Sequence, residues 1–199
     1  MSSCGRSTKP ARKPLWIGRV RRFPYTTAPA ARCSRLRYSL LPLGASSYTW
    51  AEATRDQQMD SWLRAHMHAF AYWGSVPALA IPDNTETGVT KACRYDPDLN
   101  PTYHNFAVHY GFGVMPARPY KPRGKAVVES AVQVAQRWIV AALLHRQFFS
   151  LEETNQAVGE LLERLNHRPF RKWEGTRASV FEAFDRPALK PLPSESFDI

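Results

Sequence analysis

The chain has 199 residues, of which 44% are hydrophobic and 22% are charged, and this composition supports one globular domain and excludes a wholly disordered chain. Its net charge of +10 arises entirely before residue 51, where ten Lys or Arg residues occur without any Asp or Glu. Such a basic excess indicates a nucleic-acid partner. The three cysteines lie far apart without a Cys-x-x-Cys pair, which argues against a disulfide framework or a structural zinc site and favours a reducing, cytosolic setting.

Residues 1–42 differ from the rest of the chain because they combine Arg, Pro, Ser and Ala with no acidic side chain. A basic segment interrupted by prolines buries too little apolar surface to offset the entropy of ordering. We therefore expect this segment to be disordered, or to be the translation of an unrelated reading frame. The prolines also argue against an organellar transit peptide, which needs an amphipathic pattern. Nowhere does an apolar run approach the roughly eighteen residues of a membrane span, so we expect no membrane partner.

A strand and a helix are the first elements that the sequence predicts. The stretch GASSYTWAEA, residues 44–53, carries β-branched and aromatic residues and is typical of a strand or hairpin arm. Apolar residues then recur at helical spacing over residues 54–74, with Gly74 as the expected end of the helix. His66 and His68 are two positions apart and must point to different faces of such a helix. We expect them to be surface or partly buried residues and not metal ligands.

Two buried strands flank a second predicted helix. The run VPALAIPDN, residues 76–84, is typical of a buried strand that leads into a loop at Asp83. Asn100 followed by Pro101 predicts an N-cap and first helical residue, opening a helix that closes at Gly111. The run FGVMPARP, residues 112–119, predicts another buried strand.

The last strongly patterned stretch is KPRGKAVVESAVQVAQRWIV, residues 121–140, in which a basic loop turns into an amphipathic helix. Glu129 lies in the first turns of this helix, where the helix dipole favours a carboxylate even on an ordinary surface. The alternation of strands and helices predicts an α/β architecture with parallel pairing, in which sites form at the carboxyl ends of strands. Asp83 follows such an end. Asp83 and Glu129 could therefore converge on one divalent metal site with oxygen ligands.

Three stretches together resemble a known family. They are IPDNTETGVTKACRYDPDLNPTYHNFAVHYG, MPARPYKPRGKAVVESAVQVAQRWI and LNHRPFRKWEGTRASVFEAFDRPALKPLP. The chain from about residue 44 to its end closely resembles the catalytic core of IstA-type insertion-sequence transposases, members of the retroviral-integrase-like DDE superfamily. The resemblance implies an RNase H-like fold, in which helices flank a mixed sheet.

The same resemblance implies the chemistry of a bacterial, nucleoid-associated enzyme of the cytoplasm that cleaves DNA and joins its strands. Three carboxylates in the family hold two Mg²⁺ ions, which activate the attacking oxygen and stabilise the leaving one. Asp83 matches the second aspartate and Glu129 the glutamate of this triad. Four nearby cations suit a phosphate backbone, namely Arg118, Lys121, Arg123 and Lys125. The implied partners are transposon-end and target DNA, other transposase subunits and an AAA+ ATPase helper.

The chain departs from the family pattern at the first aspartate. That residue is expected on the opening strand, before the GASSYT arm, but no carboxylate side chain occurs before Glu52. We therefore expect the first strand to be missing and at most one Mg²⁺ to be held firmly. The loop also has Gly124-Lys125-Ala126-Val127-Val128-Glu129 where the family usually has Asp-Lys-Ala-Lys-Val-Glu.

The sequence predicts an incomplete transposase core in three segments: a basic segment 1–42, an integrase-type core 43–150 and a helical, Pro-rich tail 151–199. We expect it to be inactive alone in DNA cleavage and strand transfer. One alternative is a non-catalytic fragment that binds DNA or another transposase. A second alternative is a nuclease of the same fold with a substitute ligand.

Overall fold

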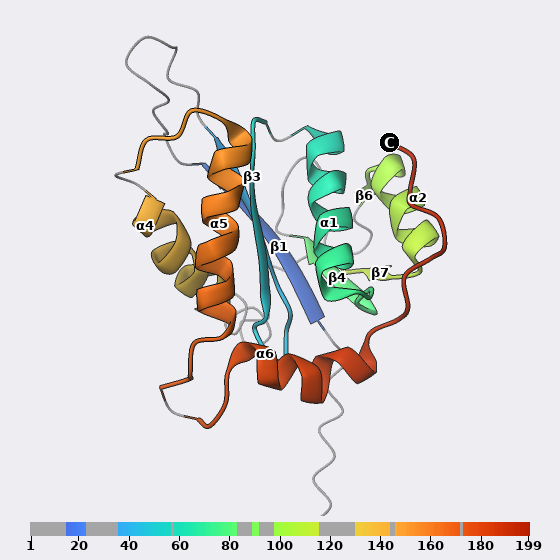
Figure 1. The fold of residues 1–199 in the computed structure, drawn as a ribbon. Coiled ribbons are helices and arrows are strands. Elements are labelled where there is room, and N and C mark those ends of the chain that lie inside the picture. Colours follow the sequence, from blue (N-terminus) through green and yellow to red (C-terminus); the bar gives the residue numbers. More distant parts are fainter. Residues whose placement is uncertain are drawn as a thin grey trace, which may run out of the picture.

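In the computed structural model of the protein, a five-stranded sheet is covered by helices on both faces (Figure 1). The structure describes residues 15–22, 36–56, 58–82, 89–91, 98–115, 130–143, 146–171 and 173–199, with the backbone alone at 15–22, 89–91 and 98–99. The strands are β1 (Leu15–Arg22), β2 (Arg37–Pro42), β3 (Thr49–Thr54), β4 (Leu79–Pro82) and β7 (Gly113–Val114), in the order β3-β2-β1-β4-β7. A separate two-stranded sheet pairs β5 (Val89–Lys91) with β6 (Asp98–Leu99).

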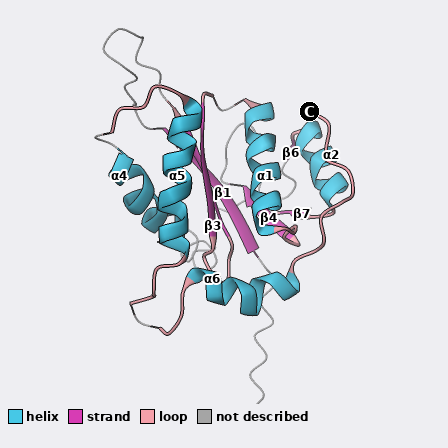
Figure 2. Ribbon diagram, viewed as in Figure 1, coloured by secondary structure: helices cyan, strands magenta, loops and turns pink. Residues whose placement is uncertain are grey.

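Helices and strands alternate along the chain, as the sequence predicts, but three strands precede α1 and three more precede α2. Figure 2 distinguishes the helices from the strands. They are α1 (Met59–Trp73), α2 (Pro101–Tyr110), α5 (Leu151–Asn166) and the short α6 (Arg177–Val180), which continues as a π-helical turn (Phe181–Asp185) and a 3-10 turn (Arg186–Ala188). Between α2 and α5 lies a helix that we call helix 130–143. It is α-helical to residue 135, π-helical over Gln136–Val140 and α-helical again in α4 (Ala141–Leu143). Within the described residues no helix has the length and apolarity of a membrane span.

The predicted helix ends of α1 and α2 are confirmed. Gly74 follows α1 with φ +66° and Gly111 follows α2 with φ +67°, a left-handed conformation that glycine adopts without strain. The side chain of Asn100 accepts a hydrogen bond from the backbone N–H of Thr102, and Pro101 occupies the first turn. The hairpin arm is confirmed in part, since the chain turns after Gly44 and the strand starts only at Thr49.

The structure corrects the expectation that the first strand is missing. Leu15–Arg22, part of the segment expected to be disordered, forms β1 in the middle of the sheet. It pairs antiparallel with β2 and parallel with β4. The residues 1–14 and 23–35 lie outside the described part of the chain, so disorder in them stays a prediction. Pairing on both edges supplies backbone hydrogen bonds that composition cannot reveal, which explains why an Arg-rich run joins the sheet.

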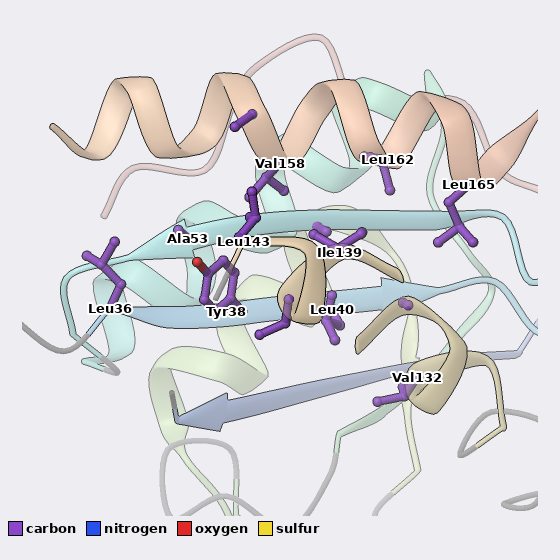
Figure 3. Packing of buried hydrophobic residues seen from close by; sticks show 14 of the residues in the cluster. Leu36, Tyr38, Leu40, Ala53, Val132, Ile139, Leu143, Val158, Leu162 and Leu165 are labelled. Carbon is purple, nitrogen blue, oxygen red and sulfur yellow. The ribbon is translucent and has the colours of Figure 1, made fainter. Parts of the chain in front are cut away.

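Two hydrophobic cores form, one on each face of the sheet. Adjacent residues of β2 point to opposite faces of the sheet and so belong to different cores. Leu40 packs with helix 130–143 and α5, whereas Leu41 packs with α1 and α2. Figure 3 shows the first core, in which Val132, Ile139 and Leu143 point from helix 130–143 onto the sheet beneath α5. The predicted apolar stripe of this helix is thus confirmed from Val132 onward, and Val128 lies outside the described residues.

α5 closes the outer edge of β3 with two asparagine side chains. The amide of Asn166 accepts from the N–H of Thr49 (3.1 Å) and donates to its carbonyl (2.9 Å). The amide of Asn155 makes the same pair of bonds to Ala53, at 2.7 and 3.1 Å. Each side-chain amide thus makes the pair of backbone hydrogen bonds that a neighbouring strand would make. The two together satisfy backbone groups that an edge strand otherwise leaves open to another chain.

His66 lies between α1 and α2 and is 1% exposed, which corrects the expectation of a surface or partly buried residue. Its Nδ1 lies 2.7 Å from the carbonyl of Trp62, and the rings of Trp62 and Tyr103 lie against it with centroids at 4.4 and 5.9 Å. Burial in this aromatic cluster lowers the pKa of His66 to about 3. His68 points to the other side, as predicted, and is largely exposed.

We predict that Asn166→Ala destabilises the fold more than Asn155→Ala. Asn166 is fully buried, so its loss leaves the N–H and the carbonyl of Thr49 unpaired, at a cost of about 2–4 kcal/mol. Asn155 is half-buried, and water can replace its amide at a cost of about 1 kcal/mol. Urea denaturation of both variants gives the two free energies of unfolding. Equal losses of unfolding free energy in the two variants would contradict the proposed importance of the buried hydrogen bonds between Asn166 and Thr49.

We also predict that His66→Leu reduces the loss of stability in acid. Below its ordinary pKa of about 6.5 the unfolded chain protonates His66, whereas the folded chain does so only near pH 3. Stability therefore falls as the pH drops through this window, by about 3 kcal/mol at pH 4 from this residue alone. Urea denaturation between pH 4 and 7 should show a flatter profile for His66→Leu. His104→Gln, at an exposed position of α2, is the control and should keep the wild-type profile.

Candidate catalytic site

The candidate site lies where β4 ends beside the middle of β1. The two strands are parallel, and their register pairs Leu15 with Leu79 and Gly18 with Pro82. β7 adds a second parallel neighbour on the other side of β4. β4 is therefore a central strand, and its carboxyl end is a position at which α/β sheets build sites.

The residues that the sequence analysis assigned to this site lie outside the described part of the chain. They are Asp83 and Glu129, proposed as ligands, and Arg118, Lys121, Arg123 and Lys125, proposed for phosphate contacts. The structure does describe their neighbours. Pro82, directly before Asp83, is the last residue of β4, and Ser130, directly after Glu129, is the first described residue of helix 130–143.

Helix 130–143 covers the face of the sheet to which position 19 of β1 belongs. Val132, in the first described turn, shares a core with Leu40 (Figure 3). Leu40 is the cross-strand partner of Arg19. Since cross-strand partners share a face, position 19 belongs to the face of helix 130–143. Position 19 also follows the pair of Gly18 with Pro82, so it is the β1 position next to the point where the chain leaves β4.

β1 brings no carboxylate to this point. Its sequence is LWIGRVRR, with arginines at positions 19, 21 and 22. Two carboxylates, Asp83 and Glu129, do not make up the three-carboxylate set that two Mg²⁺ ions require in the family. Among the described residues, moreover, no three His, Cys, Asp or Glu side chains come close enough to hold a metal ion. The residues on β1 therefore do not fit the two-ion centre.

Both carboxylates that are buried in the described residues have other partners. Oε2 of Glu52 lies 2.8 Å from Nδ1 of His68, and this contact raises the pKa of that histidine. Glu52 pairs with Ser39 on β2 and reaches α1, so it belongs to the face opposite helix 130–143. Oδ2 of Asp185 accepts the N–H of Ser46 at 3.0 Å in the turn between β2 and β3, and burial raises the pKa of this carboxyl. Neither group is a substitute for the first aspartate.

The sequence analysis missed β1 and therefore missed position 19. The available signal was the apolar triplet Leu15-Trp16-Ile17 with Val20 two residues beyond the glycine. This pattern is short, and the prolines and arginines around it are typical of a segment outside the fold. Only the pairing with β4 identifies it as the strand beside the site.

Comparison with known proteins shows that this chain is similar to insertion-sequence transposases. It is 45% identical over 157 residues to a protein of Burkholderia multivorans named as a transposase for insertion sequence IS408, covering 79% of this chain and 30% of that protein. It is 43% identical over 177 residues to a Pseudomonas fluorescens protein named as a transposase for insertion sequence IS1162, covering 89% and 32%. The chain thus spans about a third of the length of these relatives. No protein-family model matches it.

Solved structures show the same fold at low sequence identity. The catalytic core domain of HTLV-2 integrase, solved in complex with magnesium, superposes with a TM-score of 0.62 at 15% identity, over 84% of this chain and 95% of that domain. The catalytic core domain of BIV integrase superposes with a TM-score of 0.63 at 12% identity, over 88% and 98%. The resemblance inferred from the sequence motifs is confirmed: this chain is related to the transposases of bacterial insertion sequences and has the α/β fold of an integrase catalytic core.

Proposed function

We propose that this chain is a transposase-type catalytic core that has kept the integrase fold but does not cleave or join DNA by itself. The observation that supports this proposal is the amino-acid sequence of β1. The strand stands beside β4, where the family's first aspartate belongs, but it offers no Asp or Glu and has Arg19 next to the end of β4. A catalytic unit that lacks one member can lose most of its rate advantage, on the order of 10⁴ to 10⁶.

Asp83 and Glu129 keep their places as the second and third members of the triad in this proposal. The end of β4 at Pro82 and the core shared by Val132 and Leu40 support the pairing, because Pro82 pairs with position 18 of β1 and Leu40 with position 19. Arg118, Lys121, Arg123 and Lys125 contact the phosphates of DNA. The partners are DNA and other transposase subunits, with an AAA+ ATPase as a helper in the bacterial cytoplasm.

The second candidate is a protein that binds DNA, or another transposase, without chemistry. The charge distribution favours it, since the net charge of +10 lies wholly before residue 51 and includes the arginines of β1. A nuclease with a substitute ligand is less well supported, because the buried carboxylates of Glu52 and Asp185 are engaged elsewhere.

We predict that the wild-type chain shows no Mg²⁺- or Mn²⁺-dependent cleavage of end-labelled DNA and that Arg19→Asp introduces it. Position 19 shares the face of helix 130–143, so an aspartate there supplies the absent third carboxylate. Gly18→Asp is the matched control, since adjacent strand residues point to opposite faces. Arg19→Gln controls for loss of the arginine. Calorimetric titration with Mn²⁺ should show tighter binding for Arg19→Asp alone.

Two results would overturn the proposal. Cleavage by the wild-type chain that disappears in Asp83→Asn and Glu129→Gln would reveal a replacement ligand. Metal-dependent cleavage by Gly18→Asp and not by Arg19→Asp would place the site on the other face of the sheet.

We further predict that the basic residues before β1 strengthen nonspecific DNA binding. Residues 1–14 hold Arg6, Lys9, Arg12 and Lys13, and each phosphate neutralised contributes about 0.9 to the slope of log affinity against log salt. Replacing the four by Gln should flatten this slope by up to about 3.6 on duplex DNA. β1 and β2 stay intact, which a deletion of residues 1–42 would not allow. A variant with residues 2–14 in another order keeps the charges and should keep the slope.

A further inference from the structure

A short hairpin after α5 presents an aromatic side chain to solvent on a fixed frame. We call residues 167–171 and 173–176 the tail hairpin. Pro169 and Thr176 form a β-bridge, and the N–H of Phe170 donates to the carbonyl of Gly175 at 3.0 Å. Gly175 has φ +94°, and a Cβ there would lie 2.7 Å from Oγ of Ser179. The turn therefore requires glycine, and its shape is set by the backbone.

Both arms of the tail hairpin are anchored to the body of the protein. Directly after the returning arm, Arg177 donates from Nη1 to the carbonyl of Leu165 at 3.2 Å and lies 5.3 Å above the ring of Phe170. In the outgoing arm, the guanidinium of Arg168 lies 4.3 Å above the ring of Trp138 on helix 130–143. The tail hairpin is thus joined to the helix that follows Glu129 in the chain.

Trp173 lies in the tail hairpin and is 78% exposed. Three exposed cations precede it in the sequence, namely Arg164, Arg168 and Arg171. Among the described residues none of the three forms an ion pair with an acid. The nearby acids are Glu174, which is exposed, and Glu163, which accepts a hydrogen bond from Tyr72 and contacts His167. An exposed indole within a few residues of exposed guanidinium groups offers a planar face and positive charge to a ligand.

We propose that the tail hairpin binds a DNA strand with an unstacked base. Trp173 stacks on the base, while Arg168 and Arg171 contact the flanking phosphates. A nucleic acid fits better than an acidic protein, because it offers planar faces and anions at short, regular spacing. The inference goes beyond the proposed function, since it needs no metal and no carboxylate. It assigns to this chain a DNA contact separate from Arg118, Lys121, Arg123 and Lys125.

The test compares Trp173→Ala with Phe149→Ala in the full chain, by fluorescence anisotropy in EDTA. Phe149 is also exposed, at 70%, but it precedes α5, whose sixteen residues span about 24 Å and end at the tail hairpin. The probes are a labelled 20-nucleotide single strand and a blunt duplex of the same sequence. Trp173→Ala should weaken single-strand binding about tenfold or more and duplex binding much less. Trp173→Phe should retain most of the affinity, and Phe149→Ala should leave it unchanged.

The contribution of the arginines is tested separately, by the salt dependence of single-strand binding. Arg171→Gln should lower the salt slope on single strands by about 0.7, the value for one phosphate. Thermal unfolding of each variant verifies that the fold is kept, as expected for exposed positions. Single-strand affinity that is unchanged in Trp173→Ala, or lowered equally in Phe149→Ala, overturns the proposal. Competition by polyglutamate that is as strong as that of the oligonucleotide also overturns it and points to an acidic protein. Because EDTA excludes metal-dependent cleavage, failure here is distinguishable from failure of the proposed function.

Discussion

The parallel pairing of β1 with β4 is the constraint on which the rest of the structure depends. It joins residues 15–18 to residues 79–82, and the hairpin of β2 with β3 and helix α1 lie between them in the chain. β1 carries β2 on one edge and β4 on the other, so without it the sheet would divide into two parts. The pairing also fixes where β4 ends along β1. That point is the candidate site, and its position does not depend on which side chains occupy it.

Helix packing on the two faces of the sheet follows from the alternation of β2. Leu40 belongs to one core and Leu41 to the other. Helix 130–143 and α5 complete the first core, and α1 and α2 complete the second. The amides of Asn155 and Asn166 then close the edge of β3 against α5. The sheet is thus closed on its outer edge by polar groups, while its faces are covered by apolar ones.

β1 carries arginines where the resemblance to transposases led us to expect a carboxylate. The strand has three arginines and no acid. Arginine cannot ligate a divalent cation, but it attracts phosphate. The tail hairpin adds an exposed tryptophan and the exposed Arg168 and Arg171. These features underlie our proposal that the chain binds DNA without cleaving it.

The sequence by itself determined the end of α1, both ends of α2 and the family relationship. Gly74, Gly111 and Asn100 act through local backbone conformation and capping. The helix ends that they form can therefore be predicted from the neighbouring residues. The motifs around Asp83 and Glu129 likewise identified the transposase relationship without any structure. Only the tertiary structure decided that Leu15–Arg22 is a strand and that His66 is fully buried. Both depend on partners far away in the chain: β4 lies about sixty residues after β1, and α2 covers α1 from beyond the β5–β6 loop. Backbone pairing and burial between distant segments leave no periodic signal in a short, Arg-rich run, which is why the strand beside the site could not be predicted from its own residues.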